Sequence, residues 1–309
     1  MFLVVFLYMV IASTFTVGKL GLQYLQPIFL IAARMLIGGS LLLGYLCFFK
    51  RSLLKLKKEH LWLFASVILF HIFFAFVAEF WALQYLSSSK VCLFYNLSPF
   101  ISALFSYFWF TEKMTIKKFA GLMIGFFGFL PVLIFGSGYD EQTSSAFLFF
   151  SWPELAMLFS VVCASFGWIV VRKLGRYGYS VLAINGIGML GGGMLAFITS
   201  LIVEGVPKIH PVSGIFMQDV MASIGFILAL VFLANVVFYN LYGILLQQYT
   251  ATFLSFAGFL TPLFAALFGW FFIGESVSWP FFVTVVFVLF GLYIFYAEEL
   301  RQGYITSKR

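Results

Sequence analysis

The second half of this chain repeats the first half at a nearly constant spacing. Glu112 and Glu275 lie 163 positions apart, and the same spacing separates Pro99 from Pro262. Three further pairs keep this spacing, namely Ser89 and Thr252, Thr115 and Ser278, and Gly128 and Gly291. Upstream the spacing becomes 154 and aligns Lys19-Leu20-Gly21 with Lys173-Leu174-Gly175 and Gly38-Gly39 with Gly192-Gly193. The two halves therefore fold as similar units that differ in the length of one loop.

Each unit is too apolar to be soluble. Hydrophobic residues make up 63% of the 309 residues and charged residues only 9%, which leaves too little polar surface for a water-soluble globule. A helix needs about 20 apolar residues to span the hydrocarbon of a bilayer. Ten such runs are present, at 2–17, 27–49, 61–86, 89–110, 116–136, 151–171, 179–202, 220–246, 251–273 and 279–297. Because the runs are continuous and unpaired backbone groups are costly in lipid, we predict an all-α membrane protein with ten transmembrane helices.

Five spans per repeat is an odd number, so the second copy must enter the membrane from the opposite side. We predict a first repeat over 1–136, an outer connecting loop over 137–150, a second repeat over 151–297 and a cytoplasmic tail over 298–309. Inverted repeats of this kind recur in secondary transporters, in which two similar halves exchange conformations around a central site. The organisation therefore favours transport.

The net charge of +7 reports orientation in the membrane. With the N-terminus inside, fourteen basic residues fall on the cytoplasmic side: Lys50, Arg51, Lys55, Lys57, Lys58, Lys113, Lys117, Lys118, Arg172, Lys173, Arg176, Arg301, Lys308 and Arg309. The outer side holds Lys19, Lys90 and Lys208 together with Asp140, Glu141, Glu204 and Asp219. This asymmetry follows the positive-inside rule and predicts contact with membrane lipid, and it requires no nucleic-acid partner. We expect a multi-pass protein of the cell inner (plasma) membrane with both termini in the cytoplasm.

Several short motifs resemble those of a known family. Ala82-Leu83-Gln84-Tyr85-Leu86-Ser87-Ser88-Ser89, then Leu97-Ser98-Pro99, Thr111-Glu112-Lys113 and the glycines from Gly121 to Gly128 are similar to the signature of EamA-type members of the drug/metabolite transporter superfamily. The second copy repeats the signature through Gln247 to Thr252, Leu260-Thr261-Pro262, Gly274-Glu275-Ser276 and Gly291. The resemblance implies ten helices, two inverted halves and a central cavity lined by the first four helices of each half. Thr111 in place of the usual glycine, and the run Tyr242-Gly243-Ile244, depart from the pattern and weaken the expectation of symmetric roles.

Two charges lie inside the predicted spans at one depth. Arg34 is seven residues from the outer end of the second span, and Glu79 is seven residues from the outer end of the third, about 10 Å deep in each case. Charged residues in lipid face a cavity or a partner because insertion at the centre of a span costs about 2.5–3.5 kcal/mol. One interpretation is a salt bridge that neutralises both groups. The other is a substrate site in which Glu79 binds a cationic group and Arg34 a carboxylate, or in which Glu79 carries a coupled proton.

Other polar and aromatic residues are candidates for the same site. Six residues could contact the substrate: Tyr95, Asn96, Trp168, Asn235, Tyr239 and Asn240. Trp168 offers a face for a flat or cationic group, while asparagines in lipid equally serve as hydrogen bonds between helices. We interpret His71 as a hydrogen-bonded core histidine and not as a proton relay. Pro99 and Pro262 are expected to bend their helices, and Glu112 and Glu275 to cap the helices that follow them.

No catalytic, metal or cofactor site is expected. Cys47, Cys92 and Cys163 have no ligand spacing, and the chain lacks HExxH, GxSxG and paired intramembrane aspartates. The leading hypothesis is a secondary transporter of a small polar metabolite, amino-acid-like or zwitterionic, and not an enzyme. The superfamily that the chain resembles includes exporters of amino acids and carriers of S-adenosylmethionine. We name S-adenosylmethionine as the particular candidate substrate. An integral-membrane enzyme or a channel acting on lipid or a small solute is the alternative, and a homodimer is left open.

Overall fold

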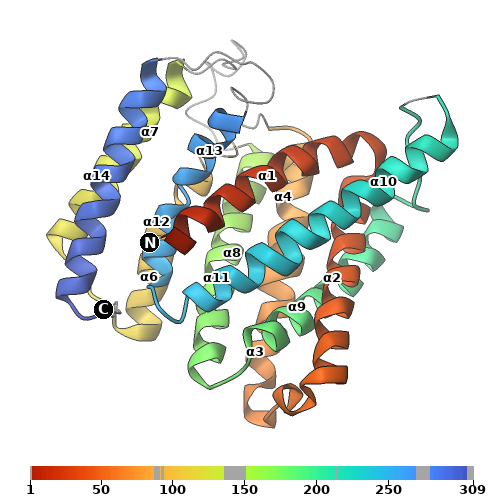
Figure 1. Ribbon diagram of the computed structural model, residues 1–309, viewed down its shortest axis with the longest axis horizontal. Coiled ribbons are helices and arrows are strands. Elements are labelled where there is room, and N and C mark those ends of the chain that lie inside the picture. Colours follow the sequence, from red (N-terminus) through yellow and green to blue (C-terminus); the bar gives the residue numbers. More distant parts are fainter. Residues whose placement is uncertain are drawn as a thin grey trace.

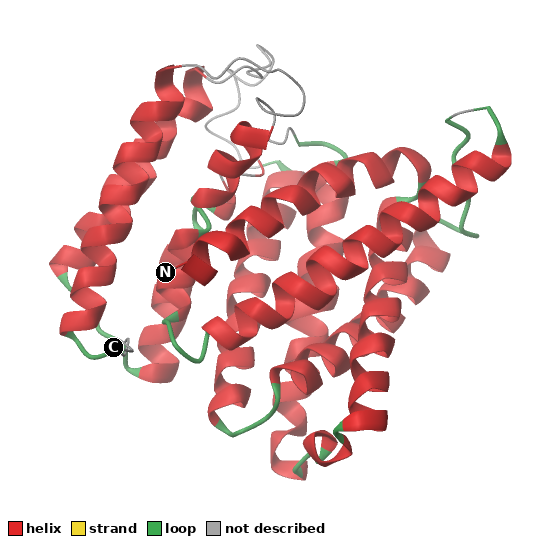
Figure 2. Ribbon diagram, viewed as in Figure 1, coloured by secondary structure: helices red, strands yellow, loops and turns green. Residues whose placement is uncertain are grey.

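The structure is a computed structural model that describes residues 2–86, 91, 94–135, 151–212, 214–268 and 279–304. Its α-helices are α1 Phe2–Tyr24, α2 Pro27–Phe49, α3 Leu61–Ser66, α4 Ala75–Leu83, α6 Ser98–Phe110, α7 Ile116–Phe135, α8 Trp152–Arg176, α9 Val181–Val203, α10 Phe216–Leu230, α11 Tyr239–Leu245, α12 Ala251–Ala257, α13 Leu260–Phe268 and α14 Trp279–Arg301. Short 3₁₀ turns cover Arg51–Leu54 and Lys58–His60, and π-helices cover Val67–Phe74 (η3) and Val231–Phe238 (η5). One isolated bridge, between Leu25 and Ile209, is the only extended pairing in this part of the chain. Figure 2 shows the helical architecture.

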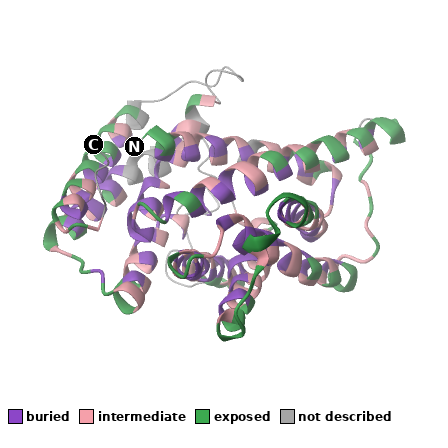
Figure 3. Cartoon of the chain, turned by 60° about the horizontal axis from the view of Figure 1, so that its bottom comes forward, coloured by how far each residue is buried: buried purple, intermediate pink, exposed green. Residues whose placement is uncertain are grey.

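The helices have the length and surface of a membrane protein. Within the described residues six segments are long and apolar enough to cross a bilayer: Pro27–Phe49, Lys58–Leu83, Trp152–Arg176, Val181–Val203, Phe216–Leu245 and Phe282–Arg301. Large apolar side chains point outward, among them Ile116 at 88% and Phe48 at 87% exposure, and Figure 3 shows buried residues lining the contacts between helices. Apolar side chains exposed on this scale are stable in lipid and not in water. The prediction of an all-helical, multi-pass membrane protein is confirmed.

Several predicted elements fall wholly or partly outside the described residues. These are Ser89, Lys90, Cys92, the loop 137–150 with Asp140 and Glu141, Gly274, Glu275, Ser276, Ser278, Lys308 and Arg309. Elsewhere the helices run past the predicted limits of the apolar runs. The first helix, predicted to end at 17, continues to Tyr24, and α8, predicted to end at 171, continues to Arg176. The polar residues at which the predicted runs ended mark the end of contact with lipid and not the end of the helix. Lysine and arginine are good helix formers, so the helix continues through them.

Pro99 and Pro262, which occupy equivalent positions in the two repeats, each lie at the start of a new helix. Pro99 occupies the first turn of α6 after a turn at Asn96 and Leu97. Pro262 lies in the first turn of α13, after α12 ends at Ala257 and a turn covers Gly258 and Phe259. Proline fits the first turn because its missing N–H has no partner there in any helix. The predicted bends are confirmed, and both take the form of a complete break in the helix.

Two π-helical segments interrupt corresponding helices of the two halves. η3 lies between α3 and α4, and η5 lies between α10 and α11, and each contains eight residues. His71 is the fifth residue of η3 and Asn235 the fifth of η5. π-helical turns are rare and concentrate at functional sites. Their appearance at matching places indicates that both halves share this irregularity.

Helix pairing follows the repeat. The second helices α2 and α9 pack together, as do the fifth helices α7 and α14, which run side by side in Figure 1. The third helices also cross between the halves, but through different parts: η3 and α4, which follows it, pack on α8, whereas η5 and α10, which precedes it, pack on α1. Within the described residues the pairs α2–α9, α6–α12 and α7–α14 each join a helix to its counterpart in the other half. Such reciprocity is expected when a twofold axis relates two similar units.

Glycines bring the paired helices to backbone contact in a reciprocal manner. A Cβ atom on Gly39 would lie 2.6 Å from the backbone nitrogen of Leu190, and one on Gly193 would lie 3.0 Å from the backbone nitrogen of Leu36. The two contacts occupy equivalent positions in the two repeats. Gly193 lies 154 positions after Gly39, and Leu190 lies 154 positions after Leu36. Small residues permit such close approach in lipid, where van der Waals packing holds helices together. The α2–α9 interface is therefore built on glycine.

We predict that Gly39→Ala destabilises the protein by about 1–3 kcal/mol, because the added methyl group overlaps the α9 backbone and the helices must separate. The matched control is Gly44→Ala on the same helix, where a Cβ atom meets nothing within 4 Å. Alanine gains the same helix propensity of about 1 kcal/mol at both positions. Thermal unfolding of the two variants in detergent measures the difference, and equal midpoints would contradict the close α2–α9 contact.

Candidate functional site

The two predicted intramembrane charges meet between α2 and α4. Arg34 and Glu79 are both buried, and each lies within electrostatic range of the other. They do not form a direct ion pair among the described residues, whose ion pairs are Lys118–Glu299, Arg172–Glu112 and Arg301–Glu298. The Arg34 guanidinium carbon lies 4.8 Å from the centre of the Phe76 ring, and its Nε has no hydrogen-bond partner. Arg34 thus keeps a donor free for another group.

Tyrosine side chains surround this pair of charges. The Tyr95 hydroxyl lies beside the Glu79 carboxylate, and Tyr239 of α11 lies within electrostatic range of both Arg34 and Glu79. The adjacent Asn96 is buried, and its side-chain nitrogen has no hydrogen-bond partner. A buried amide without a partner is uncommon and is satisfied when a ligand supplies an acceptor. Residues from α2, α4, the turn before α6, and α11 thus converge on one polar centre.

An aromatic wall adjoins the polar centre. The Trp168 ring of α8 stacks on Tyr242, with centroids 3.9 Å apart and planes 26° apart, and lies 5.3 Å from Tyr239. His71 of η3 packs edge-on against Trp168 at 4.2 Å. His71 is buried, as expected of a core histidine, but the expected hydrogen bond is absent, because neither ring nitrogen has a partner among the described residues. Trp168 and Tyr239, both expected in the site from the sequence, therefore stand together beside Arg34 and Glu79.

The asparagines of the eighth span serve the protein itself. The Asn240 amide donates to the carbonyl oxygens of Asn235 and Val236 within the π-helical segment, and its Oδ1 accepts from Asn185 of α9. The Asn235 amide nitrogen lies 3.1 Å from the Met35 sulfur. Free backbone carbonyls of an irregular helix need such partners in lipid. The structure therefore uses Asn240 to hold η5 and joins Asn235 to α2, and it does not bring either amide into contact with Arg34 or Glu79.

A second group of polar side chains, the hydroxyl string of Tyr8, Tyr242, Ser255 and Ser102, was not expected from the sequence. The Tyr8 hydroxyl of α1 donates to the Leu254 carbonyl and lies beside the Tyr242 hydroxyl. Tyr242 in turn contacts Ser255 of α12, and Ser255 lies 2.8 Å from Ser102 of α6, oxygen to oxygen. Serines and tyrosines in an apolar run carry no charge and no spacing signal, so sequence patterns did not distinguish them from packing residues.

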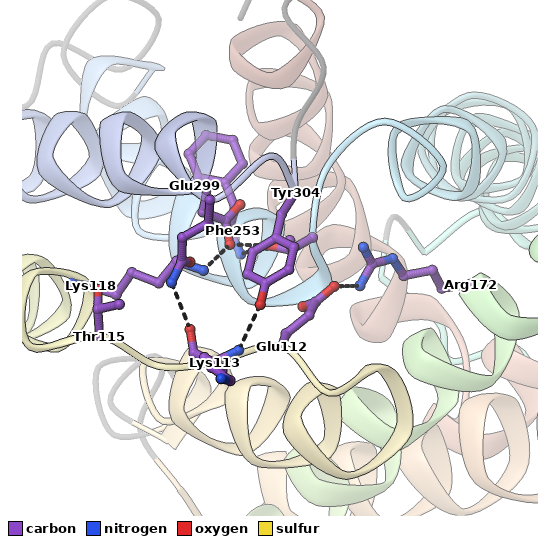
Figure 4. A network of polar contacts seen from close by, with 10 residues as sticks. Glu112, Lys113, Thr115, Lys118, Arg172, Phe253, Glu299 and Tyr304 are labelled. Atoms are coloured by element: carbon purple, nitrogen blue, oxygen red, sulfur yellow. Dashed lines mark hydrogen bonds and ion pairs between the residues drawn. The ribbon is translucent and has the colours of Figure 1, made fainter.

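Buried ion pairs join one end of the helices (Figure 4). This basic end comprises 112–118, 172–176 and 298–304. Arg172 Nη1 lies 2.6 Å from Glu112 Oε1, and Lys118 Nζ lies 3.0 Å from Glu299 Oε1, which also accepts from Thr250. The predicted capping role of Glu112 is wrong, because the Thr115 hydroxyl accepts from the Lys118 N–H at the start of α7. Glu112 pairs with Arg172 and ties the α6–α7 connection to α8.

Comparison with known proteins gives a consistent result. Residues 1–134 and 151–297 match the EamA-like transporter family. A protein of Chlamydia muridarum named S-adenosylmethionine/S-adenosylhomocysteine transporter is 36% identical over 96% of this chain and 91% of its own length, and its counterpart in Chlamydia trachomatis serovar L2 is 35% identical over 96% and 88%. The uncharacterized transporter YoaV of Bacillus subtilis is 24% identical over 91% of both chains.

Similarity extends to a solved fold. One crystal structure of a protein superposes on this chain with a TM-score of 0.73, at 19% sequence identity, over 97% of this chain and 96% of its own. At that identity the likeness concerns the fold alone. The arrangement of helices described above is therefore one that an experimentally determined protein adopts.

Proposed function

This chain belongs to the EamA-like transporter family, and from that premise we propose that it carries S-adenosylmethionine across a membrane. The observation that carries the proposal is the 35–36% identity, over 96% of the chain, to two chlamydial proteins named as transporters of S-adenosylmethionine and S-adenosylhomocysteine. The site chemistry supports it independently. A free guanidinium donor, a buried carboxylate and an aromatic wall lie together between the helices.

The substrate offers a matching set of groups. S-adenosylmethionine has a carboxylate, an ammonium group, a sulfonium centre and a flat nucleoside. In the proposed binding mode Arg34 binds the carboxylate, because a guanidinium donates two parallel hydrogen bonds to it. Glu79 binds the ammonium group, with Tyr95 orienting its carboxylate, and Asn96 donates to a substrate oxygen. The sulfonium lies against the faces of Trp168 and Tyr239, where aromatic rings attract cations.

We propose further that the protein works by alternating access with ten spans in two inverted halves, bounded at 1–136 and 151–297, with 137–150 outside and 298–309 inside. The reciprocal contacts of Gly39 and Gly193 support a twofold relation between the halves. The concentration of basic residues at one end supports cytoplasmic termini in an inner membrane. Membrane lipid is the expected environment, and a homodimer is compatible with this topology.

Contacts at both ends of the helices support a closed central site. Opposite the basic end, Glu204 after α9 accepts hydrogen bonds from the backbone N–H groups of Ile28 and Phe29 at the start of α2, at 2.8 and 2.9 Å. A carboxylate is favourable there because the first turn of a helix has unpaired N–H groups. The ion pairs of Figure 4 join the other end. Transport requires each end to open in turn.

Uptake by proteoliposomes containing the purified protein tests the proposal. We expect saturable uptake of labelled S-adenosylmethionine above that of empty liposomes, and faster uptake when the liposomes are loaded with unlabelled S-adenosylhomocysteine. Counterflow of this kind arises because both molecules share the amino-acid and nucleoside groups that the site recognises. Labelled leucine, which lacks the sulfonium and nucleoside, is the control substrate. Equal uptake of leucine and S-adenosylmethionine would contradict the proposed substrate.

A further inference from the structure

The hydroxyl string takes no part in the binding mode proposed above for the amino-acid end of the substrate. Tyr8, Tyr242 and Ser102 are buried, and together with Ser255 they come from α1, α11, α6 and α12. Helices can pack closely in lipid through glycine contacts without a hydroxyl network, as α2 and α9 do at Gly39 and Gly193. The four hydroxyls lie where four helices converge, and a polar ligand that displaced their mutual contacts would meet both donors and acceptors there.

The string lies directly under the aromatic wall. Tyr242 is both a member of the string and the ring on which Trp168 stacks, at 3.9 Å between centroids. Phe238 adds a third ring 6.3 Å from Trp168 and 5.6 Å from Tyr242. A near-parallel pair of large aromatic rings opens to take a flat heterocycle between them, since base–aromatic stacking is favourable for every base. The hydroxyls beneath are placed to meet the polar edge of such a ring.

The string and the charged centre are joined by one helical turn. Tyr239 lies beside Arg34 and Glu79, and Tyr242 follows three residues later in α11, about 4.5 Å along the helix axis. Trp168 contacts both tyrosines. A ligand with a zwitterionic end and a flat ring a few bonds away would therefore contact the charged centre and the hydroxyl string at the same time.

We propose that Trp168, Tyr242, Tyr8, Ser255 and Ser102 form a second subsite that binds the nucleoside part of the substrate. The purine ring stacks on Trp168, taking the place of Tyr242, and the freed hydroxyls of Tyr242 and Tyr8 bond to the ring nitrogens or the ribose. Ser255 and Ser102 line the far wall of the subsite. This proposal rests on the proposed function, because it assigns the remaining half of the same substrate.

Adenosine and a sulfonium amino acid without a nucleoside, S-methylmethionine, separate the two subsites. We expect Trp168→Leu to weaken the inhibition of S-adenosylmethionine uptake by adenosine about tenfold or more, the loss of one base stack. Tyr242→Phe should weaken it about threefold to tenfold, the loss of one neutral hydrogen bond. Inhibition by S-methylmethionine should change less than twofold in Tyr242→Phe, whereas Trp168→Leu should weaken it as well, because Trp168 also faces the sulfonium. Tyr45→Phe, on an exposed tyrosine of α2, is the control and should change neither.

Direct binding of adenosine keeps the test independent of transport. Adenosine should raise the unfolding temperature of the wild-type protein in detergent and raise it less in Tyr242→Phe, since a ligand that binds only the folded state stabilises it. No stabilisation of the wild type by adenosine would overturn the subsite, whatever the transport result. Equal weakening of adenosine and S-methylmethionine by Tyr242→Phe would also overturn it. Failure of S-adenosylmethionine uptake alone would instead count against the proposed substrate.

Discussion

Replacing Glu79 by glutamine is expected to lower the uptake of S-adenosylmethionine at least about thirtyfold while the protein still folds and inserts. Glutamine has the same shape and keeps a side-chain oxygen beside the Tyr95 hydroxyl, so only the negative charge is lost. Removing one member of a buried, hydrogen-bonded charge pair between protein and ligand costs about 2–5 kcal/mol, and the lower figure corresponds to about thirtyfold. Initial uptake rates in proteoliposomes, normalised to protein content, measure the effect.

Glu59→Gln is the matched control, because Glu59 is exposed in the short helix before α3 and the same change there should leave uptake within twofold. Arg34→Ala distinguishes the two interpretations of the charges. If Arg34 and Glu79 only neutralise each other, each single variant should lose folded protein, and the double variant Glu79→Gln/Arg34→Ala should recover it. If they bind substrate, all three variants should fold and none should transport. Normal uptake by Glu79→Gln would refute a substrate role for this carboxylate.

Much of the polar centre could be predicted from the sequence because charge inside an apolar run is a strong signal. Arg34 and Glu79 stand out by their cost in lipid, and counting residues from the ends of two spans placed them at one depth. The structure brings them into electrostatic range of each other and of Tyr95 and Tyr239, two further candidates from the sequence. Trp168 was a candidate through its size and aromatic face. These residues were visible because each differs chemically from its surroundings.

The rest depends on contacts that no local pattern specifies. The π-helical segments at Val67–Phe74 and Val231–Phe238 consist of residues that form ordinary helices as readily. Asn240 was a substrate candidate by type, whereas its bonds to η5 carbonyls follow from the irregular backbone. Glu112 looked like a helix cap because it precedes a helix, yet its partner Arg172 lies 60 positions away. Pairing across that distance is set by how helices pack, which a single sequence does not report.

The second large effect is expected at the basic end. Arg172→Met should destabilise the closed arrangement of this end by about 3–5 kcal/mol, because it leaves the buried Glu112 carboxylate without its partner. The pair links the α6–α7 connection of the first half to α8 of the second. In a carrier whose ends open alternately, the lower figure shifts the population toward the open state by about a hundredfold. Ser106 reports this opening, because it is buried and lines a small cavity of about 10 Å³ with Glu112 and Lys118.

The readout is labelling of Ser106→Cys by a water-soluble maleimide, in a background in which Cys47, Cys92 and Cys163 are replaced by serine. Labelling should be slow with Arg172 present and at least about tenfold faster with Arg172→Met, whereas Arg51→Met at an exposed position should have no effect. Adding Glu112→Gln to Arg172→Met should slow labelling again, because removing both members of a buried pair restores a neutral interface. A pair that only held the fold would lower thermal stability in the single variant and leave the labelling rate of the remaining folded protein unchanged. That outcome would separate Glu112 and Arg172 from the opening of the transporter, and it would leave Lys118 and Glu299 as the ion pair that controls this end.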